Sequence, residues 1–217
     1  MAQKIEYMLI RNFLLNLANT IMLRKNHLDE LDAACGDGDL GVGMYIGFGN
    51  VKKAIEQKKS RDIGDLLDTA GRAILSSVGG ASGALFGTLF IESGKVASGK
   101  SEIDLKDLSN MFGVSLEKIR QRGGAKLGDK TLIDALEPAV ESLEDAVQRN
   151  LDLTEALRMA ADAARTGVES TRNLVARQGK ARYLGEQTLG HVDPGAEVMK
   201  LIFETLLVTC QSSTSIS

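Results

Sequence analysis

The chain has little of what builds strands, disulfides or membrane spans. Among its 217 residues there are no Trp, six Phe, three Tyr and two Pro. Strand-rich domains carry more aromatic and turn residues than this, so the composition favours helices. No run approaches the roughly 20 apolar residues that cross a bilayer, and the opening MAQKIEYML lacks the layout of a signal peptide. We therefore expect a cytoplasmic protein that does not enter a membrane.

The chain also has few cysteines and no net positive charge. Cys35 and Cys210 are the two cysteines, and they lie too far apart in sequence for a Cys-x-x-Cys metal site and are too few for a disulfide framework. The formal net charge is −3, which leaves no basic field to displace counterions from nucleic acid. We expect no nucleic-acid partner.

Apolar residues recur at helical spacing through most of the chain, beginning with Ile5, Leu9, Phe13 and Leu17. The pattern predicts about eight helices, two of them over residues 42–58 and 82–97. Pro138 falls inside another, where it should kink the helix or release a backbone hydrogen bond. The length suits one domain over residues 1–210, and residues 211–217 (QSSTSIS) read as a frayed tail.

Glycine is abundant, with 23 residues. Helix interiors disfavour glycine by about 1 kcal/mol relative to alanine, so this number needs another explanation. The glycines gather in four clusters at predicted helix junctions: GDGDLGVG, SSVGGASGALFG, RGGAKLGDKT and YLGEQTLGHVDPG. Such junctions suggest one end of a bundle where the backbone approaches a ligand closely.

The first cluster contains Gly36, Gly38 and Gly41 in the G-x-G-x-x-G spacing of a dinucleotide-binding turn. That fingerprint follows a strand, whereas the preceding LRKNHLDELDAA is polar and helix-like. An EF-hand fails on spacing: counted from Asp37, the fifth position is glycine and the twelfth is Phe48. Neither motif explains the acids of this segment.

Three aspartates in eight residues suit a hard divalent cation better. Asp32, Asp37 and Asp39 offer the oxygen ligands that Mg²⁺ prefers, and bound magnesium turns repulsion between aspartate and phosphate into attraction. The flanking glycines would let backbone N–H groups at the next helix start reach the same phosphates. The alternative is a solvated acidic turn in which an aspartate caps a helix.

The other clusters allow similar pairs of interpretations. Ser82 sits where it could bind phosphate or ribose, but Gly83 and Gly87 could equally permit close helix packing. Asp129 is a natural helix N-cap in GDKT. His191 could act as a base or phospho-carrier, although a lone loop histidine usually does neither.

Four blocks, LDAACGDGDLG, SSVGGASGALFGTLF, GDKT and YLGEQTLGHVDPGA, together resemble the nucleotide-binding L subunits of dihydroxyacetone kinases, in order and approximate spacing from about residue 5 to 208. The resemblance implies an all-α barrel of eight antiparallel helices that holds ADP or ATP with two Mg²⁺ ions at one end. The family's metal-binding aspartates correspond to Asp32, Asp37 and Asp39. Its nucleotide contacts correspond to Leu40, Gly41, Val42, Gly43, Ala81, Ser82, Gly123, Leu132, Lys180, Asp193, Pro194 and Gly195.

Four positions depart from the family pattern. The family block reads G-D-x-D-H-G-x-N-M, so Leu40 replaces His and Gly43 replaces Asn, and Leu132 replaces a common Met. Lys180 stands where Arg is frequent, and because Lys lacks a planar fork, Arg182 is a candidate to share the phosphate contact.

The resemblance also implies partners. A separate K subunit would bind the ketose, and in phosphotransferase-linked systems a phosphohistidine-bearing M subunit recharges ADP that stays on the L subunit. We favour that system; a split kinase using free ATP, for example on erythrulose, and a homodimer are left open. A non-catalytic regulatory module and a Mg²⁺-dependent hydrolase using His191 are the rival functions.

Overall fold

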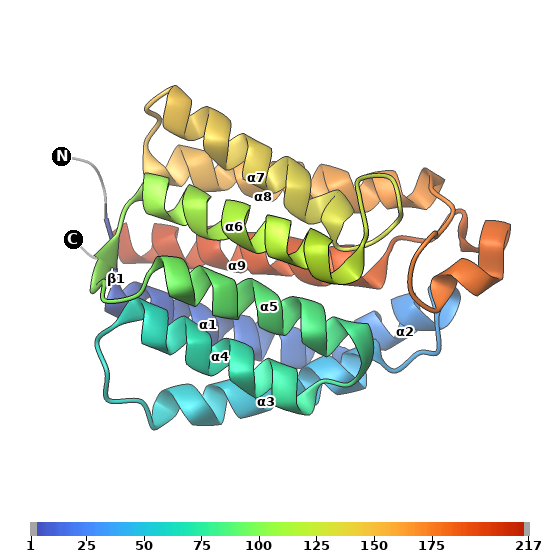
Figure 1. Ribbon diagram of the computed structural model, residues 1–217, viewed down its shortest axis with the longest axis horizontal. Helices are drawn as coiled ribbons and strands as arrows, with labels where there is room; N and C mark the ends of the chain where they lie inside the picture. The colour runs from blue at the N-terminus through green and yellow to red at the C-terminus, as the bar shows by residue number, and fades with distance from the viewer. Residues whose placement is uncertain (1–3, 215–217) are drawn as a thin grey trace.

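The computed structural model describes residues 4–214 and is almost entirely helical (Figure 1). None of the helices in this part of the chain is long and apolar enough to cross a membrane. In chain order the elements are β1 (Ile5–Glu6), α1 (Tyr7–Leu23), α2 (Lys25–Cys35), α3 (Leu40–Glu56), α4 (Ile63–Ser77), α5 (Gly80–Val96), β2 (Glu102–Ile103), α6 (Leu105–Gly123), α7 (Ile133–Gln148), α8 (Leu153–Ser170), η1 (Thr171–Asn173), η2 (Ala181–Thr188) and α9 (Pro194–Thr214).

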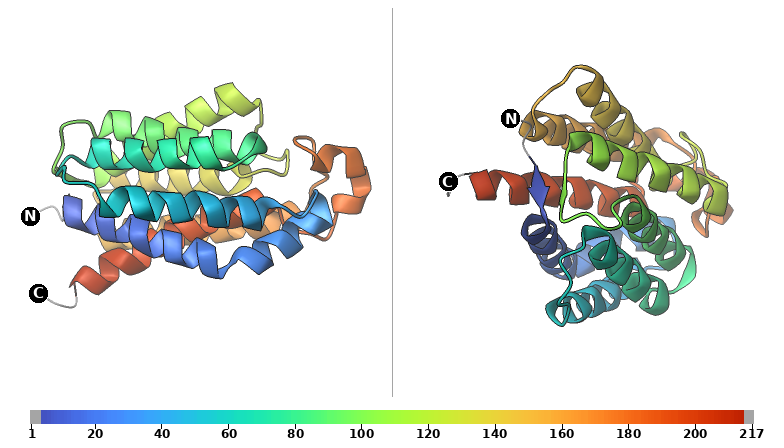
Figure 2. Two further views of the ribbon diagram at one scale, coloured as in Figure 1. Left: turned by 90° about the horizontal axis from the view of Figure 1, so that it is seen from below. Right: turned by 60° about the vertical axis from the view of Figure 1, so that its left-hand side comes forward.

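Eight long helices form a closed ring. Each packs against the next in the order α1, α3, α4, α5, α6, α7, α8 and α9, and α9 returns to α1 (Figure 2). The remaining helix, α2, follows α1 after a break at Arg24 and extends from one end. The predicted all-α barrel of eight antiparallel helices is therefore confirmed within the described residues.

The apolar faces meet inside this ring. Phe112 of α6 and Phe203 of α9 stack with ring centroids 4.7 Å apart, and Phe48 meets Phe90 edge-on at 6.4 Å. Burying one such side chain contributes about 1.5–3 kcal/mol, so the ring depends on the spacing of these residues. At the end that holds the termini, β1 pairs with β2 through Ile5 opposite Ile103.

The alternating direction of the helices brings all four glycine clusters to the other end. Helices α3, α5, α7 and α9 begin there, while α4, α6 and α8 end there (Figure 1). Helix N-termini expose unpaired N–H groups and carry partial positive charge. The architecture thus gathers four such starts at one face, next to α2 and η2.

Helix α7 runs without interruption through Pro138. Proline cannot donate to the carbonyl four residues earlier, so the carbonyl oxygen of Asp134 is released from the helix, as expected. Any side chain at Gly167 of α8 would collide with that oxygen, and the two helices therefore cross closely at this point. Helix α9 extends to Thr214, four residues into the expected tail, and the rest of the tail lies outside the described residues.

Candidate functional site

Three carboxylates converge at the end where the helices begin. Asp32 lies in the last turn of α2, Asp37 in the following loop and Asp39 directly before α3. One oxygen from each lies within 4.8 Å of the others. This grouping brings together the three aspartates that the sequence singled out and fits the oxygen donors that magnesium prefers.

Asp32 also fixes the start of α3. Its Oδ2 accepts hydrogen bonds from the backbone N–H groups of Asp39 and Leu40, at 2.9 and 3.2 Å. A side chain on Gly36 would lie 2.6 Å from the other oxygen, Oδ1, so glycine leaves that oxygen accessible. Gly38 adopts a left-handed backbone, with φ of +76°, which favours glycine at this turn.

The cluster holds more negative charge than its neighbours balance. Lys180, just before η2, pairs with Asp37 and lowers the pKa of that carboxyl group. The pKa of Asp39 is raised, first by desolvation and then by the charge of Asp37. The Asp39 side chain makes no capping hydrogen bond to α3. Within residues 4–214, Lys180 is the cation that pairs with this cluster of three acids, and a divalent ion would balance the remaining negative charge.

A fourth acid, Asp29, supports the site in a way that sequence reasoning missed. Its Oδ1 accepts from the N–H of Val42 at 3.0 Å, and its other oxygen pairs with Lys25 at 2.8 Å. Gly41 has no room for a side chain against Asp29 and the carbonyl of Lys25. The spacing of Lys25 and Asp29 on one helix face was the available signal. Residues 40–43 form the first turn of α3, which begins two residues before the helix predicted over 42–58.

The junction of α4 and α5 lies beside that turn. Gly43 faces Val78, whose Cγ1 would be 3.5 Å from a side chain placed there. Gly80 has φ of +66° and begins α5, so exposed Ala81 and half-buried Ser82 occupy its first turn. The close packing expected of Gly83 is also present, because a side chain would collide with the carbonyl of Val78. Both interpretations of this cluster are compatible with the structure.

The starts of α7 and α9 form another wall of the site, beside the acid cluster and the α4–α5 junction. Leu132 is buried, and its Cβ would lie 3.5 Å from a side chain placed on Gly195. Asp193 accepts from the N–H of Ala196 at 2.7 Å, which caps α9 ahead of Pro194. Burial of the carboxyl group raises the pKa of Asp193 to about 7.

Cys35 connects this wall to the acid cluster. Its buried thiol approaches the carbonyl of Val192 at 4.0 Å. Cys35 is the last residue of α2, the helix that carries Asp32, so this contact brings the acid cluster close to the segment that leads into α9. At the end of α6, a side chain on exposed Gly123 would lie 3.3 Å from Leu85 of α5.

The loop before α7 differs from expectation in one respect. Asp129 does not cap α7; its carboxylate accepts from the N–H of Lys126 at 3.0 Å, inside the loop. The Asp134 carboxylate binds the loop instead, accepting hydrogen bonds from the backbone N–H groups of Gly128 and Thr131 at 2.6 and 2.7 Å. The helix begins later than the GDKT motif suggests, so the second acid reaches the free N–H groups.

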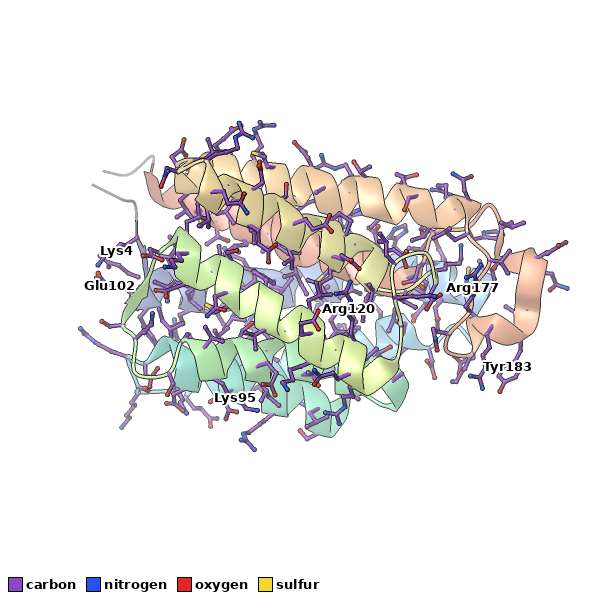
Figure 3. All side chains as sticks on the ribbon, turned by 45° about the horizontal axis from the view of Figure 1, so that its top comes forward. Lys4, Lys95, Glu102, Arg120, Arg177 and Tyr183 are labelled. Atoms are coloured by element: carbon purple, nitrogen blue, oxygen red, sulfur yellow. The ribbon has the colours of Figure 1, made fainter. Side chains whose placement is uncertain are left out.

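The segment around η2 projects from this end of the molecule. Arg182 lies over the ring of Tyr183, 4.7 Å from its centroid, and donates to the Tyr183 hydroxyl at 2.6 Å. Figure 3 places Tyr183 and Arg177 at this end, opposite Lys4 and Glu102. Of the two cations expected to contact phosphate, Lys180 meets the acid cluster, whereas Arg182 is engaged with tyrosine.

A family model described as the DAK2 domain matches residues 34–208. The chain belongs to the DAK2 domain family. The matched range of this DAK2 domain includes Asp37 and Asp39 and extends past the Asp193 turn, while Asp32 lies just before it.

Two curated relatives are similar along almost their whole length. The PEP-dependent dihydroxyacetone kinase, ADP-binding subunit DhaL of Escherichia coli (strain K12) is 37% identical over 202 residues, covering 93% of this chain and 96% of that protein. The PEP-dependent dihydroxyacetone kinase 1, ADP-binding subunit DhaL of Listeria innocua is 40% identical over 185 residues, covering 85% and 87%.

A solved structure has the same fold. The dihydroxyacetone kinase of C. freundii in complex with AMP-PNP and Mg²⁺ aligns with a TM-score of 0.71 and 28% identity. The alignment covers 96% of this chain but 35% of that kinase, so the DAK2 domain described here spans about a third of the longer protein.

Proposed function

We propose that this DAK2 domain is the nucleotide-binding subunit of a kinase for dihydroxyacetone or a similarly short ketose. The observation that carries the proposal is the convergence of Asp32, Asp37 and Asp39, with one oxygen of each within 4.8 Å of the others, at the face where four helices begin. The names of the relatives support a phosphotransferase that works through bound ADP.

The aspartates would hold two magnesium ions, and the helix starts would hold the phosphates. Magnesium supplies charge neutralisation for the phosphoryl group in transfer. The N–H groups of residues 40–43 and 80–82 begin α3 and α5, where partial positive charge favours an anion. Lys180 is close enough to Asp37 to reach the same phosphates.

The base of the nucleotide would lie against the wall of Leu132 and Gly195. Apolar contact from Leu132 suits a planar base, and glycine at 195 lets the base approach the start of α9. Gly123 at the end of α6 and the Asp193–Pro194 turn would complete this side of the proposed pocket.

No nucleophile or base need come from this chain, because the substrate would be activated on a partner subunit. We infer that a ketose-binding K subunit docks against this face in the cytoplasm, and that a phosphohistidine-bearing M subunit recharges the bound ADP. Free ATP as donor is the competing arrangement. It would require ADP to leave after each turnover, whereas a recharged ADP would stay bound.

One experiment separates these cases. The purified chain is denatured and the released nucleotide identified, and the chain is then mixed with its K subunit and dihydroxyacetone, with either ATP or the phosphorylated M subunit. Retained ADP and product formation with the phosphoprotein alone support the phosphotransferase-linked form. Product with free ATP alone supports the split kinase, and no product with either donor contradicts the proposed function.

A further inference from the structure

Lys130 is the most unusual residue at this end of the protein. It is 2% exposed, and its φ of +59° places it in the left-handed region that non-glycine residues rarely adopt. Lysine is almost never fully buried unless its charge is partnered. Strained backbone combined with a buried cation therefore needs a reason, and such combinations gather at functional sites.

The ammonium group binds two backbone carbonyls from different parts of the chain. It donates to the carbonyl oxygen of Thr171 at 2.6 Å and to that of His191. Thr171 in turn accepts, through Oγ1, from the N–H of Asp193 at 2.9 Å. One side chain from the loop before α7 thus joins the end of α8 to the turn that begins α9.

The surroundings of the ammonium group explain why it stays there. Asp193 and Asp134 contribute negative charge, Arg172 contributes positive charge, and Cys35 faces the group as a buried thiol. Burial lowers the pKa of Lys130. The hydrogen bonds to fixed carbonyls compensate the ammonium group for its lost hydration. The side chain therefore works as a strut, a fixed link between the end of α8 and the turn before α9.

The strut connects the two halves of the proposed base-binding wall. Leu132 follows Lys130 by two residues, and Asp193 follows His191 by two residues. Leu132 and Gly195 are neighbours across this wall. We propose that Lys130 is a positioning residue that sets the separation of residue 132 from the 193–195 turn and thereby the affinity for nucleotide. The inference rests on the proposed function.

A purely structural role would have a different signature. Losing a buried hydrogen bond anywhere in the barrel lowers the melting temperature, but only a residue that sets the pocket changes nucleotide affinity as well. Ser115 provides the comparison, because its buried hydroxyl donates to the carbonyl of Leu89 at 2.9 Å between α6 and α5. Its truncation to Ala costs stability away from the starts of α7 and α9.

The test compares Lys130→Met, Lys130→Arg and Ser115→Ala with the wild-type chain. The dissociation constant of ADP is measured with magnesium by calorimetry, alongside melting temperature and the turnover of the reconstituted kinase. Met keeps the length of the side chain but donates nothing, so we expect at least tenfold weaker ADP binding with unchanged turnover at saturating nucleotide. Arg should restore most of the affinity, and Ser115→Ala should leave it unchanged.

The outcomes distinguish the two proposals. If Lys130→Met binds ADP within twofold of the wild-type affinity, the positioning role of Lys130 is overturned. An equal loss of ADP affinity in Ser115→Ala overturns it too. If Lys130→Met does not fold, Lys130→Gln decides: its shorter side chain cannot reach both the Thr171 and the His191 carbonyls, so weaker ADP binding supports the inference and binding within twofold of wild type overturns it. A wild-type chain that binds no ADP overturns the proposed function and the strut together.

Discussion

Replacing Asp39 with Asn should separate metal binding from folding. The Asp39 side chain makes no hydrogen bond to α3, so the amide loses no helix cap. Its pKa is raised in the folded protein by desolvation and by the charge of Asp37, which means that folding disfavours the charged form. At pH 7.5 the Asn variant without ligand should therefore melt at or above the wild-type temperature.

The effect of ligand should have the opposite sign. A ligand at 100 times its dissociation constant stabilises a protein by about 2.7 kcal/mol, which in a chain of this size raises the melting temperature by about 5–11 °C. Losing a metal ligand should weaken binding by at least about 100-fold, because even indirect supports of metal sites are worth 10–100-fold. The shift should then fall to about 1–2 °C in the Asn variant.

The assay is thermal unfolding with and without ADP and magnesium at fixed concentration. Asp162→Asn is a matched control, because it removes the same charge from exposed ion pairs on α8. It should keep the full ligand-induced shift. The reasoning fails if Asp39→Asn keeps a shift like that of the control, or if the variant without ligand melts several degrees lower.

Three other predictions concern the pH response, the packing and the departures from the family pattern. Burial raises the pKa of Asp193 from 3.8 to about 7, so the contribution of this group to the free energy of unfolding should fall by up to about 4 kcal/mol as pH rises from 4 to 7. In urea unfolding at several pH values, Asp193→Asn should therefore gain stability relative to the wild type as pH rises through this range. Gly167→Ala should lose about 1–3 kcal/mol against the Asp134 carbonyl, whereas Gly49→Ala, with open space around it, should gain up to about 1 kcal/mol by the same measurement. A side chain at residue 43 would be in ordinary contact with Val78, so Gly43→Asn should fit, and one restored hydrogen bond should tighten ADP binding by about 2- to 13-fold in calorimetry; unchanged affinity would contradict a phosphate contact there.

Much of the fold follows from local pattern. Apolar spacing located the helices to within a few residues, as at α3, expected from residue 42 and observed from Leu40. Glycine clusters marked the junctions correctly, because glycine in a helix interior costs about 1 kcal/mol relative to alanine and is therefore disfavoured there. The grouping of Asp32, Asp37 and Asp39 was predictable since eight residues of flexible chain can hardly keep them apart.

Long-range contacts were not predictable in this way. Lys130 in GDKT reads as an exposed charge, and only the arrival of Thr171 and His191 from distant parts of the chain buries it. Asp129 and Asp134 both stand near a helix start, and which one holds the N–H groups depends on the residue where the helix begins. Asp29 acquires its role from Val42, on the far side of the glycine turn.

The closure of the ring by α9 links the last step of folding to the completion of the proposed nucleotide site. Helices α1 and α8 each lack a neighbour until α9 is inserted between them, so a folding chain in which α9 has not yet docked exposes apolar flanks on both. The same insertion delivers Asp193 and Gly195 to their places beside Leu132. Pairing the first helix with the last is a slow, non-local event. Nucleotide binding should consequently depend on the docking of α9 between α1 and α8.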